Sequence, residues 1–177
     1  MISGVQIGFQ RVLFQQHREK NMFACTYRTP VGEITLAEEN GALKRLSFGH
    51  LPKLPAGTEV KETPLILKAR RQLDEYFAGQ RHRFDLPLQP EGTSFQQKVW
   101  SALQSIPYGK TASYKDIAVK IGNPRACRAV GMANNKNPLA IVIPCHRVVG
   151  SDGKLVGYGG GLGIKEYLLN LELKAGA

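Results

Sequence analysis

The chain has 177 residues, of which 42% are hydrophobic, and a formal net charge of +10 at neutral pH. This length accommodates one large or two small domains, and no apolar run approaches the length of a membrane span, so we expect no membrane association. The three cysteines are odd in number and widely spaced, which favours a reducing, cytoplasmic compartment over a disulfide framework. They form no zinc-binding pattern with the four histidines.

The first part of the chain is predicted to be an extension followed by a small β domain. Residues 1–21 lack the apolar core and cleavage site of a signal peptide. Between residues 22 and 90 we expect an antiparallel sheet covered by one helix. Its strands are expected at residues 23–27, 33–37, 43–48 and 84–88. Asn40-Gly41 is the favoured pair for a type I′ hairpin. Residues 51–63 read as a loop, and apolar residues at every fourth position from Leu65 to Phe77 predict a helix that ends near Gly79.

The second part, residues 91–177, is predicted to be mostly helical. Ser94 and Gln97 have the spacing of a capping box, as do Ser113 and Asp116 ahead of a second helix. Asn123-Pro124 is expected to open a third helix, with Asn as the N-cap and Pro in the first turn. The second and third helices form a helix-turn-helix candidate, although such pairs also serve as plain packing. A last helix is expected at residues 164–173.

The basic charge lies mainly in this second part. Residues 1–92 carry 13 basic and 10 acidic side chains, whereas residues 93–177 carry 11 and 4. That imbalance favours a polyanionic partner, most simply nucleic acid.

The predicted third helix combines two arginines, Arg125 and Arg128, with the small residues Ala126, Cys127, Ala129, Gly131 and Ala133. A helix with its side chains is about 10–12 Å across, while the minor groove of DNA is about 6 Å wide. Small side chains would let the helix approach a widened minor groove. The alternative is that the alanines form a packing stripe.

The segment from Ile141 to Gly150 is rich in Val and Ile around a single Cys145-His146 pair. We expect a buried strand that stops at Pro144, because proline supplies no donor and restricts the residue before it. Cys145 would then stand at the end of an apolar element. Neighbouring residues of a strand point to opposite faces, so proton transfer between Cys145 and His146 would need a turn or a bridging water. A buried structural cysteine beside a satisfied histidine is the alternative.

The segment Pro144-Cys145-His146-Arg147-Val148 resembles the signature of the O6-alkylguanine-DNA alkyltransferases, or methylated-DNA–protein-cysteine methyltransferases. Further matching segments occur in the family's order: Phe95-Gln96, Val99-Trp100, Ile106-Pro107, Gly109, Ser113-Tyr114, Arg128-Ala129-Val130-Gly131, Asn137-Pro138, Gly157-Tyr158, Gly160-Gly161 and Lys165-Glu166. The resemblance implies an α+β fold. Its N-terminal domain, residues 22–90, would be ribonuclease H-like without chemistry of its own, and a helix-turn-helix catalytic domain would follow at residues 91–177.

The resemblance also implies roles for single residues. The catalytic residues would be Cys145, His146, Glu172, Tyr114 and Lys165. Substrate would be bound by Arg128, Asn137, Val148, Val156, Tyr158 and Gly159. DNA would be bound by Ser113, Tyr114, Arg125, Ala126, Cys127, Arg128, Ala129 and Gly131. The expected partner is double-stranded DNA containing O6-alkylguanine, held through the minor groove with the damaged nucleotide flipped out and Arg128 in its place. No metal and no cofactor are expected, and the protein is expected to act as a monomer.

The expected chemistry is a single transfer of the alkyl group to Cys145. A free thiol has a pKa near ~8.5, and lowering it by about two units would make most of it nucleophilic at neutral pH. We expect His146 and Glu172 to lower the pKa of the thiol in this way. Val156 stands where the family commonly has Gly or Thr, and with Ala140 it is expected to narrow the pocket; Gly159 and Tyr167 are further departures. Two alternatives remain, a cysteine hydrolase and a lesion sensor that binds without repair.

Overall fold

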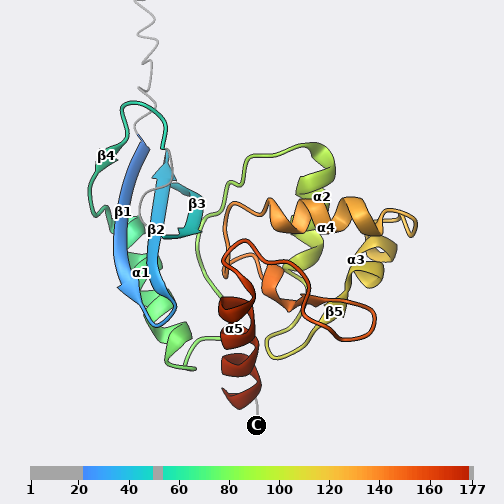
Figure 1. Ribbon diagram of the computed structural model, residues 1–177. Coiled ribbons are helices and arrows are strands. Elements are labelled where there is room, and N and C mark those ends of the chain that lie inside the picture. The colour runs from blue at the N-terminus through green and yellow to red at the C-terminus, as the bar shows by residue number, and fades with distance from the viewer. Residues whose placement is uncertain (1–21, 50–53, 176–177) are drawn as a thin grey trace, which may run out of the picture.

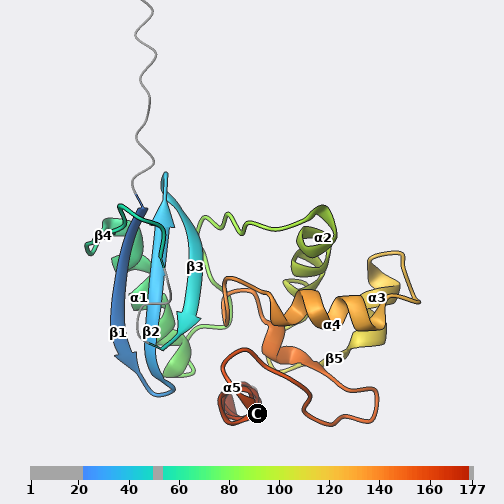
Figure 2. The same cartoon turned by 45° about the horizontal axis from the view of Figure 1, so that its top comes forward.

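The computed structural model describes residues 22–49 and 54–175, and it consists of a sheet-and-helix unit packed beside a mostly helical unit (Figures 1 and 2). The predicted extension, residues 1–21, lies outside the described residues.

The sheet is built from an antiparallel meander, as predicted, with one addition. Strands β1 (Met22–Thr29), β2 (Gly32–Glu39) and β3 (Ala42–Phe48) pair in that order. Asn40 and Gly41 both have positive φ, at 53° and 76°, as a type I′ turn requires. The segment predicted to be a loop contains β4 (Glu59–Val60), which pairs in parallel with β1. The parallel pairing of β4 makes the sheet mixed and not purely antiparallel as predicted. A strand of two exposed residues has no periodicity from which it could be predicted.

Helix α1 (Pro64–Phe77) covers one face of this sheet (Figures 1 and 2). The hydroxyl of Thr63 caps it by accepting a hydrogen bond from the backbone N–H of Ile66, at 3.2 Å. Of the predicted apolar face, Ala69, Leu73 and Phe77 are buried and Leu65 is half-buried, and Gly79, with φ of 73°, follows the helix end.

The strand predicted at residues 84–88 does not form. Its last residue, Leu88, makes an isolated bridge with Leu43 of β3. The N–H of Leu43 donates to the carbonyl of Pro87 at 2.8 Å, and the N–H of Gln89 donates back to Leu43 at 2.9 Å. Pro87 has no N–H with which to continue a ladder, so the segment remains extended chain.

The helical unit contains four α-helices, a single 3-10 turn and a short pair of parallel strands among the described residues. They are α2 (Ser94–Leu103), β5 (Ala112–Ser113), α3 (Tyr114–Lys120), α4 (Cys127–Asn135), η1 (Cys145–Arg147), β6 (Val148–Val149) and α5 (Leu162–Ala175). The capping box of α3 joins Ser113 and Asp116 as predicted. That of α2 lies one residue earlier than predicted, between Thr93 and Gln96.

Helix α4 begins later than predicted, at Cys127. Asn123-Pro124 instead belongs to a turn in which the N–H of Ala126 donates to the carbonyl of Asn123 at 3.0 Å. Proline fits the second position of a turn as well as the first turn of a helix, so the sequence pattern suited both. Arg125 and Ala126 therefore precede the helix, and Ala126 caps it without a side-chain hydrogen bond.

The two units meet along β3. The N–H of Leu46 donates to the carbonyl of Pro138 at 2.8 Å, and the N–H of Ala140 donates to that of Leu46 at 3.2 Å. One hydrophobic core runs through both units. Within the helical unit, the indole N–H of buried Trp100 on α2 donates to Ala133 of α4 at 2.8 Å. The predicted α+β fold is confirmed, and no helix in the described part of the chain is long and apolar enough to cross a bilayer.

Candidate active site

The apolar stretch before Cys145 is a compact turn and not the predicted strand. Ile141 has φ of +69°, a costly conformation for a β-branched residue. The N–H of Ile143 donates to Leu139 at 2.9 Å, and that of Cys145 donates to Ile143 at 2.8 Å. Pro144, at φ −80° and ψ 63°, is thus the centre of an inverse γ-turn. The predicted break at Pro144 is correct, but the strand predicted for the Val/Ile run is wrong, because buried turns and buried strands are equally apolar.

Asn137 fixes the thiol of Cys145, a residue that is 4% exposed. Its side-chain amide donates to Cys145 Sγ at 3.0 Å and to the carbonyl of Ile143 at 2.8 Å. Its Oδ1 accepts the N–H of Leu139 at 3.0 Å, which sets the orientation of the amide. Asn134, which the sequence did not single out, donates to the carbonyl of Cys145 at 3.3 Å.

The electrostatics of the thiol differ from the expectation. Burial raises the pKa of Cys145, and the hydrogen bond from Asn137 and the charge of Lys165 only partly oppose it. The resting site therefore holds a neutral thiol and not a preformed thiolate.

Behind the thiol, His146 and Glu172 form a buried pair. His146 Nε2 lies 2.7 Å from Glu172 Oε1, which directs the Nε2 proton to the carboxylate. His146 Nδ1 is then the basic nitrogen, and it has no hydrogen-bond partner among the described residues. Burial lowers the pKa of His146 despite the carboxylate. The imidazole is thus neutral in the resting protein.

Glu172 is held by more donors than the sequence suggested. Arg147 donates to both carboxylate oxygens at 2.9 Å, the N–H of Gly109 donates to Oε2 at 3.0 Å, and Tyr76 donates to Oε1 at 2.8 Å. Burial alone would raise the pKa of Glu172, but the hydrogen bonds and charges of His146 and Arg147 outweigh it and lower the pKa to about 2. The sequence motif contains Arg147 but predicts no role for it, and nothing in the sequence points to Tyr76, which lies 70 residues before His146.

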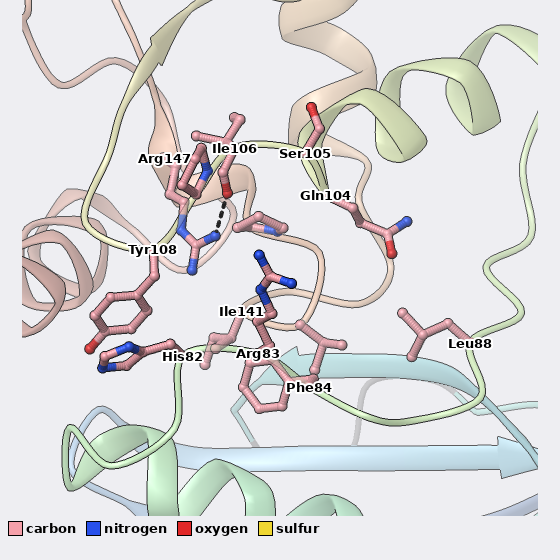
Figure 3. Close-up of a pocket in the computed structure, with 13 residues that line it drawn as sticks. His82, Arg83, Phe84, Leu88, Gln104, Ser105, Ile106, Tyr108, Ile141 and Arg147 are labelled. Carbon is pink, nitrogen blue, oxygen red and sulfur yellow. Dashed lines mark hydrogen bonds between the residues drawn. The ribbon is translucent and has the colours of Figure 1, made fainter.

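Two cavities flank the turn that carries Cys145. Figure 3 shows the one behind it, a cavity of about 350 Å³ that Pro144 and Arg147 line and Cys145 does not. In this cavity Arg147 donates to the carbonyl of Ile106 at 2.7 Å, and Tyr108 stacks on His82 at the rim. The one in front, about 310 Å³, opens onto Cys145 itself. Its lining includes the predicted Asn137, Tyr158 and Gly159. It also includes Arg45, Phe48 and Ala140, of which the first two come from β3.

Val156 does not line that front cavity. Its side chain is half exposed, and its carbonyl accepts hydrogen bonds from Lys165 Nζ at 2.7 Å and from the Tyr114 hydroxyl at 3.4 Å. The fully buried Lys165 also donates to Val148 at 2.6 Å, so it ties two segments of the site together. A carbonyl has a second lone pair, which leaves Val148 able to accept from a substrate.

The predicted DNA-binding residues gather around α3 and α4. Arg125, Arg128 and Ala129 are exposed, and Ala126 and Cys127 are half-buried. Because Ala129 is exposed, the three alanines do not form the alternative packing stripe; Val130 and Ala133 face the core instead. A Cβ on Gly131 would lie 3.6 Å from the Tyr114 ring, so the two helices approach closely there. Ser113 is occupied as the cap of α3.

Comparison with known proteins decides the family. The model of the 6-O-methylguanine DNA methyltransferase ribonuclease-like domain matches residues 22–90, and that of the DNA binding domain of the same enzyme matches residues 94–174. The methylated-DNA–protein-cysteine methyltransferase of Methanosarcina barkeri is 54% identical over 85% of this chain and 97% of its own length. The constitutive one of Bacillus subtilis is 50% identical over 83% and 93%. This chain belongs to the methylated-DNA–protein-cysteine methyltransferase family.

Solved structures agree with this assignment of the methyltransferase. The Mycobacterium tuberculosis O6-methylguanine methyltransferase superimposes with a TM-score of 0.80 at 46% identity, covering 87% of this chain and 94% of that one. The structure of M. tuberculosis OGT in complex with DNA gives a TM-score of 0.80 at 46% identity, covering 86% of this chain and 94% of that one. The matching family models and relatives confirm the resemblance predicted from the sequence motifs. Members of this family repair DNA by methyl transfer to a cysteine.

Proposed function

We propose that this methyltransferase restores O6-alkylguanine, and also O4-alkylthymine, in duplex DNA by moving the alkyl group irreversibly onto Cys145. The observation that carries the proposal is the position of the thiol. Cys145 Sγ is hydrogen-bonded to Asn137 at the wall of a cavity of about 310 Å³, directly before the His146–Glu172 pair. The other cysteines, Cys25 and Cys127, lie at neither cavity.

The reaction is a single displacement. The thiol proton of Cys145 passes through a water to His146 Nδ1, and the sulfur attacks the alkyl carbon as the bond from that carbon to guanine O6 breaks. The leaving guanine takes the electron pair and gains a proton at N3 from Tyr114. The raised pKa of the free thiol supports a proton transfer that occurs only with substrate bound. The product is a thioether, so each molecule acts once.

Substrate reaches Cys145 by nucleotide flipping, in this proposal. The exposed start of α4 enters the minor groove, and Arg128 occupies the gap left by the extruded base. The DNA on either side of this gap is contacted by Ser113, Arg125, Ala126, Cys127, Ala129 and Gly131. Tyr158 and Gly159, which line the cavity, and the backbone at Val148 bind the base. Unstacking a base costs a few kcal/mol, less for a weakly paired lesion.

The two domains have different roles in this proposal. Residues 91–177 carry catalysis and DNA binding, while residues 22–90 form the ribonuclease H-like domain. We propose that the protein acts in the cytoplasm as a monomer, without metal or cofactor. The free state of all three cysteines supports a reducing compartment.

The test is the mass of the protein after incubation with duplex DNA containing O6-methylguanine. We expect each molecule to gain one methyl group, with one guanine restored and no further turnover. Peptide mapping should place the methyl on Cys145. The Cys145→Ala variant should bind DNA and accept nothing, whereas Cys25→Ala, which changes a cysteine of β1, should still be methylated. Repair of many guanines per molecule, an unchanged protein mass with the lesion left in place, or methyl on another cysteine would each refute the proposal.

A further inference from the structure

Tyr76 belongs to the ribonuclease-like domain, yet its hydroxyl lies among the catalytic groups of the other domain. It is in the last turn of α1 and is fully buried. Its hydroxyl donates to Glu172 Oε1 at 2.8 Å and lies 3.5 Å from His146 Nε2. Its ring packs edge-on against Tyr108, with centroids 6.1 Å apart, and Tyr108 in turn stacks on His82. The packing of the ring and the hydrogen bond to Glu172 together limit the directions in which the hydroxyl can point.

The oxygen that Tyr76 contacts is the one that orients the imidazole. Glu172 Oε1 accepts from Tyr76, from His146 Nε2 and from Arg147 Nη2, while Oε2 accepts from Arg147 Nε and Gly109. Three donors converging on Oε1 fix the direction of each. Burial, and the negative charge of Glu172, raise the pKa of Tyr76 far above its usual value, so it remains a donor at every pH at which the protein works.

We infer that Tyr76 is a positioning residue for the proton acceptor His146, so that the ribonuclease-like domain takes part in alkyl transfer. This inference rests on the proposed function. By donating to Oε1, Tyr76 reduces the pull of the carboxylate on the Nε2 proton and fixes the plane of the imidazole. Nδ1 is thereby aimed at the proton of Cys145.

Removal of the hydroxyl has a defined effect on titration. Glu172 would lose a neutral donor and interact more strongly with His146, which favours the imidazolium and raises the pKa of His146. A base must be unprotonated to act, so the acidic limb of the pH–rate profile should move to higher pH. The other charged or titratable groups that influence His146 or Tyr76 stay in place in such a variant: Arg147 on η1, Lys165 and Glu172 on α5, Tyr108 before β5, Tyr158 before α5, and Cys145 itself.

The test compares Tyr76→Phe with Tyr27→Phe. Tyr27 is a matched control, because it is a buried tyrosine of the same domain whose hydroxyl has no hydrogen-bond partner among the described residues. The rate constant for methyl transfer from duplex DNA to Cys145 is measured against pH for both variants and the wild type. We expect Tyr76→Phe to shift the acidic limb upward by about half to one pH unit, with a three- to tenfold slower reaction below it. Tyr27→Phe should retain the wild-type profile.

A profile of Tyr76→Phe that coincides with that of Tyr27→Phe, whatever its stability, would overturn the inference. A second measurement uses the wild type alone and needs no variant to fold. The Tyr76 hydroxyl proton should exchange slowly and show a nuclear Overhauser effect to the ring of His146. Fast exchange without that effect would also overturn the inference. A wild-type protein that accepts no methyl group would refute the proposed function instead, and the hydroxyl measurement would still report on the contact.

Discussion

Arg147 donates two hydrogen bonds of 2.9 Å to Glu172, one to each carboxylate oxygen, and both side chains are buried. The third guanidinium nitrogen donates to the carbonyl of Ile106 at 2.7 Å, so the arginine also joins the loop after α2 to α5. This pair anchors the carboxylate against which His146 is oriented. Its planar two-point geometry suits arginine and not lysine.

Arg147→Ala is therefore expected to lower the free energy of unfolding by about 3–5 kcal/mol, because it leaves Glu172 charged and buried without its main partner. Urea unfolding measures this. Adding Glu172→Gln to the variant should recover part of the loss, since the uncompensated charge is removed. Arg81→Ala, which breaks a partly exposed pair with Glu75, is the control and should cost about 1 kcal/mol or less. Equal losses for Arg147→Ala and Arg81→Ala would contradict the assigned role.

The lowered pKa of Glu172 predicts an acid-sensitive contribution to stability. The folded value is about 2, below the ordinary value of 4.5 for the unfolded chain. The stabilisation is fully present above pH ~4.5 and is lost as the pH falls toward 2. The difference in unfolding free energy between wild type and Glu172→Gln should thus shrink steadily below pH ~4.5, by a few kcal/mol in total. A difference that stays constant between pH 6 and pH 3 would show that Glu172 titrates normally.

Arg128→Ala should slow repair of duplex DNA by at least about tenfold and leave reaction with the free O6-methylguanine base nearly unchanged. The arginine acts only where a base has been extruded from a helix. Rates of Cys145 methylation with the two substrates measure this. Arg71→Ala, an exposed arginine on α1, is the control and should affect neither rate. An equal loss with both substrates would mean that Arg128 acts on Cys145 or on the fold.

Pocket breadth should depend on Ala140 and not on Val156. Ala140 lines the cavity at Cys145, whereas Val156 does not. Ala140→Leu is expected to lower the benzyl-to-methyl rate ratio for O6-alkylguanine bases by about tenfold or more, because the added methylenes fill the space that the ring needs. Val156→Gly should change that ratio less than about twofold, since Val156 is half exposed and does not line the cavity. A large gain with Val156→Gly would restore the role inferred from the sequence.

Many of the secondary-structure elements and caps of this protein were predicted from local sequence patterns. The type I′ pair Asn40-Gly41, the apolar spacing from Leu65 to Phe77 and the Ser113–Asp116 capping box act within a few residues, so their physics is contained in the sequence. The Pro144–Val148 motif likewise pointed to the family, which the comparisons confirm, and it contains the proposed nucleophile, Cys145.

The wrong predictions concern segments whose conformation is set by contacts with residues distant in the sequence. β4 and the extended chain at residues 84–88 depend on which backbone groups a neighbouring strand presents, and their own residues do not determine that. Ile141 adopts a strained turn because the surrounding core holds it, where its propensity favours a strand.

The site divides in the same way. The proposed nucleophile and base, Cys145 and His146, are adjacent in sequence, so a motif contains both. Tyr76, Arg45 and Phe48 reach the site only because the two units pack together along β3 and α1. The raised pKa of Cys145 arises from burial, which depends on the packed tertiary structure and not on the neighbouring residues alone. The sequence by itself therefore determined the type of chemistry, and the tertiary structure decided how the thiol, the base and the supporting hydroxyl are held.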